Sequence, residues 1–163
     1  MALKKQQAVF FHGVEQLVTM QAAARKQGRQ VDEKDLSIVN DGGLIVQDGR
    51  LLFVGKRLAC QKFLHQQKLK VKSVDLKTKT VLPGFVECHT HAAFVGSRAH
   101  EFEWRQNGVS YQEIARRGGG IQSTVEAVKE SSYKDLVAAT LKNVDAFIRQ
   151  GVTTLEIKSG YGL

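Results

Sequence analysis

The chain has 163 residues, of which 42% are hydrophobic and 25% charged, a composition typical of a globular protein and not of a disordered or fibrous one. It contains no run of 18 apolar residues and its first twenty residues lack the layout of a secretory signal, which predicts a cytoplasmic protein with no membrane partner. The net charge of +8 lies wholly in residues 1–83, where 15 Lys and Arg face 7 Asp and Glu. Because these basic residues are scattered and lack interleaved aromatic side chains, we expect no nucleic-acid partner.

Residues 1–83 are predicted to form a small β-rich domain with one helix. The polar stretch 21–35 is typical of a loop, and a helix is expected at 58–67. The clearest signal is a hairpin around Asp48-Gly49, since an Asp-Gly step suits a tight turn. Strands are expected at 8–11, 15–20, 43–47, 51–55, 72–76 and 80–82. Such a set of short strands predicts a small sandwich-like β domain.

The pattern changes at Pro83, and residues 84–163 are predicted to contain one βαβ unit. A strand at 84–91 and a strand at 152–157 are separated by a helix that begins at Ser131 or Ser132 and ends at Gly151. An insertion of about forty residues follows the first strand, a place where α/β barrels carry active-site loops. It contains a helix with the capping box Ser110-Tyr111-Gln112-Glu113, which three glycines at 118–120 end.

A single parallel strand pair with one helix cannot cover both faces of its sheet and leaves two unpaired edges. An eight-stranded α/β barrel needs roughly 200 residues or more. We therefore expect a truncated fold of the α/β plus β class, in which 1–83 is a segment of a composite β domain and 84–163 begins a TIM-type (β/α)8 barrel. Exposed strand edges also favour a homo-oligomer.

The most informative motif is His89-Thr90-His91 on the predicted strand 84–91. Side chains alternate faces along a strand, so both imidazoles share one face at a Cα separation of about 7 Å, where they can converge on one metal ion. The alternative is a pair of histidines without a metal on an ordinary strand. The sequence therefore predicts a two-histidine metal site that lacks its further ligands.

The segment 82–91, Leu-Pro-Gly-Phe-Val-Glu-Cys-His-Thr-His, resembles the first barrel strand of the amidohydrolase superfamily, whose metal hydrolases carry a His-x-His pair there. Glu87 stands where that superfamily more often has Asp, which keeps the carboxylate. The segments 94–98, 110–121 and 156–163 narrow the resemblance to the branch that opens a cyclic amide in histidine degradation.

This resemblance implies hydrolysis of the small-molecule substrate 4-imidazolone-5-propanoate to N-formimidoyl-L-glutamate. It further implies one divalent or trivalent metal ion, zinc or iron, with His89 and His91 as two of its ligands. Arg98 would hold the propionate group, because an arginine fork matches a carboxylate, and Tyr161 and Tyr111 match substrate-contacting positions. The remaining ligands and the general acid or base would follow residue 163, so we expect the chain alone to be inactive and to bind metal weakly.

Each of these assignments has an alternative. Arg98 could be a solvated surface residue, Tyr111 could pack in the first turn of its helix, and Tyr161 could belong to an ordinary glycine turn. Glu156 and Lys158 could line the site or form a structural ion pair. For the whole protein, a different amidohydrolase such as a nucleobase deaminase, or a non-catalytic basic β module, remains open.

Overall fold

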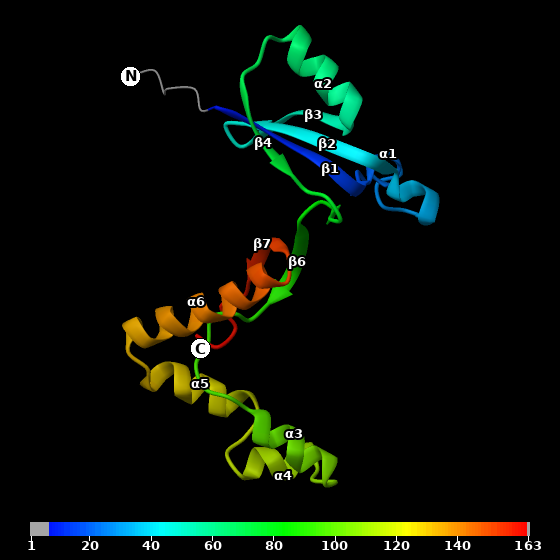
Figure 1. Ribbon diagram of the computed structural model, residues 1–163. Coiled ribbons are helices and arrows are strands. Elements are labelled where there is room, and N and C mark those ends of the chain that lie inside the picture. Colours follow the sequence, from blue (N-terminus) through cyan, green and yellow to red (C-terminus); the bar gives the residue numbers. More distant parts are fainter. Residues whose placement is uncertain (1–6, 163) are drawn as a thin grey trace. The chain divides into compact units, whose positions relative to one another are not determined.

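The computed structural model describes residues 7–162, so residues 1–6 and 163 of the predicted domains lie outside the described part. The chain divides after Pro83 into two compact units (Figure 1). This boundary coincides with the proline at which the sequence pattern changes. Within residues 7–162, no helix is long and apolar enough to cross a membrane.

The first unit is built on one mixed sheet of five strands. These are β1 (Ala8–Val18), β2 (Ile38–Gln47), β3 (Arg50–Lys56), β4 (Val71–Asp75) and β5 (Thr80–Val81). The strand order is β3-β2-β1-β4, and β5 also pairs with β1. The β1–β2 and β2–β3 pairs are antiparallel, whereas β4 and β5 run parallel to β1. Within residues 7–83, the described part of the first unit, no second sheet is found, so the sandwich stays a prediction.

The hairpin at Asp48-Gly49 is confirmed, and both turn residues have positive φ, 50° and 73°. The two short strands predicted at 8–11 and 15–20 are instead one continuous strand, β1. Its register with β2 shifts between Phe11 and Val14, where Gly13 has a φ of +68°. A β-bulge thus accommodates this glycine within one strand, where the sequence analysis expected a break between two strands.

The core of the first unit lies under α2 (Arg57–Gln66), the helix that the sequence predicted at 58–67. Figure 1 shows α2 lying along the sheet. Phe10, Ile45 and Cys60 are fully or almost fully buried there, and Phe53 and Phe63 stack with ring centroids 5.0 Å apart. Burial of these apolar side chains is the main stabilising contribution available to this unit.

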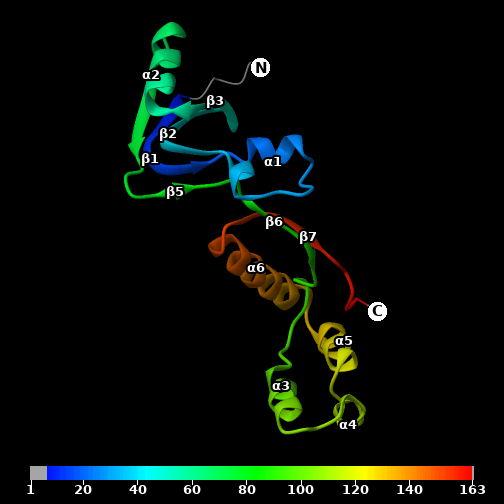
Figure 2. The ribbon, with the colours of Figure 1, turned by 90° about the vertical axis from the view of Figure 1, so that its right-hand side faces the viewer.

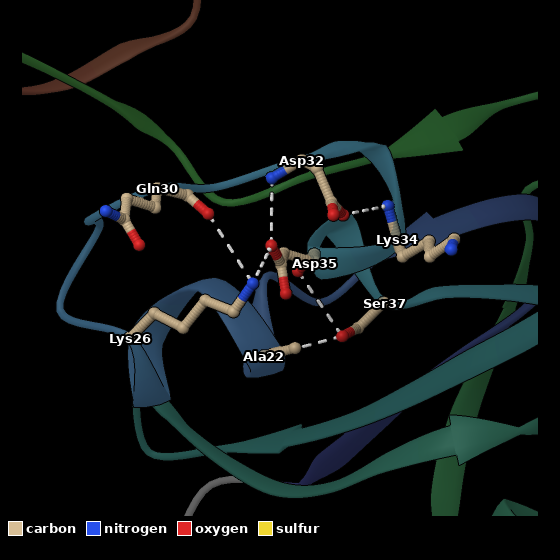
Figure 3. Close-up of polar contacts among 7 residues, drawn as sticks. All are labelled: Ala22, Lys26, Gln30, Asp32, Lys34, Asp35 and Ser37. Atoms are coloured by element: carbon tan, nitrogen blue, oxygen red, sulfur yellow. Dashed lines mark hydrogen bonds and ion pairs between the residues drawn. The ribbon is translucent and has the colours of Figure 1, made fainter.

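The predicted loop 21–35 contains helix α1 (Gln21–Arg25) and a 3-10 turn at Glu33–Leu36, which is a correction to the sequence analysis. Asp35, only 5% exposed, holds the two together (Figure 3). Its Oδ2 accepts hydrogen bonds from Lys26 Nζ at 2.6 Å and from the backbone N–H of Asp32 at 2.8 Å. The Lys26 ammonium holds the pKa of the Asp35 carboxyl below its ordinary value of 3.8.

Replacing Asp35 with asparagine is expected to lower the free energy of unfolding near neutral pH. Because the pKa of Asp35 is lower in the folded state, its carboxylate stabilises the fold above pH 3.8, and this contribution is lost as the pH falls through the folded-state pKa. Urea unfolding should give a lower free energy of unfolding for Asp35→Asn than for the unmodified protein, and this difference should disappear in acid. Asp41→Asn, which removes an exposed ion pair with Arg57, is the control and should have a smaller effect. A difference in unfolding free energy that stays constant with pH would contradict the stabilising role of the Asp35 carboxylate.

The second unit contains the predicted parallel strand pair, β6 (Phe85–Thr90) and β7 (Val152–Ile157). Figure 2 shows the two strands side by side with α6 (Tyr133–Arg149) beside them. Ser132 caps this helix, its Oγ accepting from the N–H of Asp135 at 3.1 Å. The predicted strand, helix and strand are therefore confirmed at almost the predicted boundaries.

The excursion between β6 and α6 holds three helices instead of the single helix predicted. They are α3 (Ala99–Gln106), α4 (Tyr111–Arg116) and α5 (Ile121–Glu130), of which only α4 was expected. The Ser110 cap and the glycines that end α4 lie where the sequence placed them. In α3, the alternation of charged and apolar residues gives a weak helical pattern, which explains why it was missed.

Apolar side chains of the second unit remain at its surface. Val86 of β6 is 67% exposed, and Leu141 and Ile148 of α6 are 59% and 60% exposed. None of the side chains of α6 is buried among the described residues. A two-stranded parallel sheet is normally covered on both faces, as in an α/β barrel. The barrel itself stays a prediction.

Candidate functional site

His89 and His91 lie at the carboxyl end of β6 and face the same side of the strand. Their ring centroids are 5.4 Å apart and the rings are nearly perpendicular, at 71°. Thr90, between them, points to the other face and is buried. Its Oγ1 donates to the carbonyl of Glu156 at 2.8 Å, which fastens the end of β6 to β7. The strand pairing thus holds the two imidazoles in place.

A pocket of about 490 Å³ opens at the two histidines. Its walls come from β6, from the segment after it, from α6 and from the residues that follow β7. The lining residues are Glu87, His89, Thr90, His91, Ala92, Phe94, Asn143, Ala146, Phe147 and Tyr161. A cavity of this size with a few polar groups among apolar ones has the character of a small-molecule site.

The surroundings of His91 suit a metal ligand. Its Nδ1 is buried and has no hydrogen-bond partner among the described residues. Tyr161 packs on the imidazole with a centroid distance of 5.1 Å. A β-carbon at position 160 would stand 2.5 Å from Cε1 and Nδ1 of His91, so only glycine permits this approach. A buried ring nitrogen without a partner is what a bound metal or an ordered water would satisfy.

The residues present therefore fit part of a metal site. Two neutral imidazoles are good ligands for zinc or iron, but a catalytic zinc site uses three protein ligands. Within residues 7–162, no group of three or more His, Cys, Asp and Glu side chains is placed to hold a metal ion. The described part of the chain can supply two ligands and would depend on further residues for the others.

Glu156 and Lys158 form the ion pair that the sequence analysis gave as one of two alternatives. Lys158 Nζ lies 2.9 Å from Glu156 Oε1, and this contact is the main cause that lowers the pKa of the Glu156 carboxyl. Glu156 Oε2 is nevertheless buried without a partner among the described residues. The ion pair is thus present, Glu156 retains one acceptor without a partner among the described residues, and a part of this pair in the site stays a prediction.

Arg98 and Tyr161 line a second pocket of about 220 Å³ with Phe94, Gly96, Ser97 and Thr124. Phe94 and Tyr161 belong to both pockets, so the space at Arg98 adjoins the space at the histidines. Arg98 is half-buried, and its guanidinium makes no hydrogen bond or ion pair with another described residue. An arginine held in a pocket without a partner is available for an anionic group of a ligand.

Tyr111 differs from the other residues expected at the site. It is 64% exposed at the start of α4 and lines neither pocket. The structure thus brings together His89, His91, Arg98 and Tyr161, whereas a role for Tyr111 in substrate contact stays a prediction.

Three residues that sequence reasoning missed also shape the site. Phe94 and Thr124 line pockets, and Asn143 Nδ2 on α6 donates to the carbonyl of Ala92 at 2.9 Å, which ties down the segment after His91. Asn143 and Ala92 are 51 positions apart, and no local pattern predicts such a contact. The apolar spacing within 121–130 could have revealed α5 and with it Thr124.

Comparison with known proteins shows clear relatives. The imidazolonepropionase of Bdellovibrio bacteriovorus is 45% identical over 163 residues, which are all of this chain and 38% of that protein. The imidazolonepropionase of Methylobacterium nodulans is 47% identical over 128 residues, 78% of this chain and 31% of that protein. The chain thus spans about a third of the length of these relatives. A scan against family models found no match.

Solved structures were also compared. Ochratoxinase from A. niger aligns with 98% of this chain and 27% of its own, at a TM-score of 0.49 and 13% identity. Guanine deaminase from E. coli aligns with 93% of this chain and 30% of its own, at a TM-score of 0.42 and 18% identity.

Over its whole length the chain is thus similar to an imidazolonepropionase.

Proposed function

We propose that this chain provides part of the active site of a metal-dependent hydrolase that converts 4-imidazolone-5-propanoate to N-formimidoyl-L-glutamate. In this reaction water adds across a C–N bond of the cyclic amide. The observation that supports the proposal most strongly is the junction of two pockets, one holding the histidine pair and one holding an arginine that has no partner among residues 7–162. A ring with a short carboxylate arm matches such an arrangement.

His89 and His91 would hold the metal ion, zinc or iron, together with ligands from outside the described residues. When bound, such a metal lowers the pKa of water and polarises a carbonyl, so that hydroxide is available near neutral pH. Tyr161 and Gly160 keep the imidazole of His91 in one orientation through the ring contact and the close approach described above. Cytoplasmic location and a homo-oligomeric state remain part of the proposal.

Arg98 would bind the propionate group of the substrate. Its guanidinium can donate two parallel hydrogen bonds to a carboxylate, and the hydroxyl of Ser97 lies in the same pocket. Because Phe94 and Tyr161 separate this pocket from the histidines, the ring of the substrate would lie against them, with its carbonyl toward the metal site. Arg98 thus orients the substrate, and the histidine side of the site acts on it.

A chimera tests the proposal. The matched region of the Bdellovibrio bacteriovorus imidazolonepropionase is replaced with this chain, which is 45% identical to it over 163 residues. We expect metal-dependent opening of 4-imidazolone-5-propanoate. The decrease of the substrate's ultraviolet absorption measures this reaction. A folded, metal-loaded chimera that deaminates guanine or cytosine but leaves the imidazolone intact would support the alternative amidohydrolase.

Replacing Arg98 with lysine in this chimera should raise KM about tenfold with a smaller change in kcat, because lysine cannot make the paired hydrogen bonds to the carboxylate. Steady-state kinetics over a range of imidazolone concentrations measures KM and kcat separately. Arg105 lies in the last turn of α3 and lines neither pocket. Arg105→Lys is therefore the matched control and should leave KM and kcat unchanged. Equal effects of the two substitutions would contradict the role of Arg98.

A further inference from the structure

Glu101 on α3 is a buried carboxylate without a cationic partner among the described residues. It is 7% exposed, and its Oε1 accepts a hydrogen bond of 2.7 Å from the backbone N–H of Gly120. Burial of a carboxylate is costly unless specific contacts compensate for it. A neutral side chain would fill this position at a lower cost in folding free energy, so the presence of a carboxylate at position 101 requires an explanation.

The bond between Glu101 and Gly120 connects the beginnings of two helices. Glu101 lies in the first turn of α3, and its N–H donates to the carbonyl of Arg98 at 3.0 Å. Gly120 is the N-cap of α5 and has no side chain with which to cap it. The Glu101 carboxylate, which comes from a different helix, accepts from the N–H of this N-cap residue itself, as the glutamate of a capping box does, at the end of α5 where the helix dipole favours negative charge.

The backbone at this junction is shaped for the carboxylate. Gly120 has a φ of +78°, which disfavours any residue with a β-carbon. A β-carbon at position 119 would stand 2.7 Å from Ile114 Cγ2 and 3.0 Å from Glu101 Oε1. Both glycines are thus needed for the turn to reach Glu101.

The two helix starts that Glu101 joins are also two walls of the arginine pocket. Arg98 immediately precedes α3, and Thr124 lies in the first turn of α5, where it is 6% exposed. Both line the 220 Å³ pocket, whereas Glu101 lies outside it. The Glu101–Gly120 hydrogen bond is therefore a direct link between the segment that carries Arg98 and the helix that carries Thr124.

We propose that Glu101 is a positioning residue that sets the distance between Arg98 and Thr124 and thereby the affinity of this pocket for a carboxylate. This inference rests on the proposed function only in taking a carboxylate as the ligand of Arg98. A structural role alone would require Glu101 for stability and leave carboxylate affinity unchanged.

The test measures propionate binding to the 163-residue chain by NMR, from shifts of the Arg98 Nε–Hε and Thr124 amide signals. Propionamide, which has the same shape without charge, is the ligand control. Hydrogen exchange of the Gly120 amide reports the link, and urea unfolding reports stability. The variants are Glu101→Ala, Glu101→Asp and Glu101→Gln, with Glu113→Gln as the matched control, since Glu113 pairs with Arg116 and Arg117 at the surface.

We expect Glu101→Ala and Glu101→Asp to weaken propionate binding about tenfold and to speed exchange at Gly120, since neither can reach its N–H. Glu101→Gln should stay within about threefold of the unmodified chain, because its amide oxygen still accepts the bond. Glu113→Gln should change none of these measurements. If Glu101→Ala does not fold, Glu101→Asp, which retains the charge, takes its place in the binding measurement.

Two results would overturn the inference in distinguishable ways. If Glu101→Asp is less stable yet binds propionate like the unmodified chain, Glu101 only stabilises α5, and the role of Arg98 stands. If the unmodified chain and Arg98→Ala bind propionate and propionamide alike, the pocket is not a carboxylate site, and the proposed role of Arg98 fails as well.

Discussion

His91→Ala is expected to lower the hydrolytic turnover of the chimera by about a thousandfold or more, because a catalytic metal that loses one protein ligand is neither retained nor correctly placed. The Nδ1 of His91 is buried and has no hydrogen-bond partner in the described part of the chain, and its ring lies against Tyr161 and Gly160. His89→Ala should have a similar effect. Metal content measured by mass spectrometry should fall together with turnover at 4-imidazolone-5-propanoate.

Cys88 offers the matched control for this experiment. It lies between Glu87 and His89 on β6, is exposed, and points away from the face of the histidines. Cys88→Ala should retain turnover and metal within about twofold, since it removes no ligand. Full activity and full metal content in His91→Ala would refute the assignment of the pair as metal ligands.

Gly160→Ala is expected to reduce turnover about a hundredfold, the effect typical of a displacement of about 1 Å at a catalytic group. The new β-carbon would stand 2.5 Å from two atoms of the His91 imidazole. The ring must therefore rotate or the segment after β7 must move, and Tyr161 would move with it. NMR signals of the His91 ring should shift in the 163-residue chain, and turnover and metal content should fall in the chimera.

Gly162→Ala separates this effect from a general loss of backbone freedom. A β-carbon there would meet only the carbonyl of Ser159, at 3.4 Å, an ordinary contact. We expect Gly162→Ala to keep the His91 signals in place and turnover within about threefold, as at other sites where a new methyl group causes no clash. If both alanine variants lose activity equally, the close approach of Gly160 to His91 is not the reason that glycine is required.

Several parts of the fold follow from patterns that a few neighbouring residues contain. The hairpin at Asp48-Gly49 was predicted because a positive φ is needed at that turn and the step supplies it. The helix after Ser132 and the strand at 152–157 were predicted from a cap and from apolar spacing. The common face of His89 and His91 was likewise predicted, because alternation along a strand is a local property.

Other features depended on contacts between distant residues. Asp35 was placed in a loop because polar residues favour loops, yet its bond to Lys26, nine positions earlier, helps to bury it and to fold the segment. The bulge in β1 depends on pairing with β2, and the start of α5 is joined to Glu101 of α3 by a hydrogen bond across 19 positions. None of these partners is recognisable from spacing along the chain.

The candidate site divides in the same way. Residue types at short spacing were sufficient to predict the histidine pair and the strand that bears it, whereas Arg98 was predicted from the family resemblance. The three-dimensional arrangement was needed to show that Arg98 and Thr124 share a pocket next to the histidines, that Gly160 touches His91, and that Tyr111 lies outside both pockets. These facts arise from packing between segments tens of residues apart, where side-chain volume and burial, which no local pattern records, determine which groups meet.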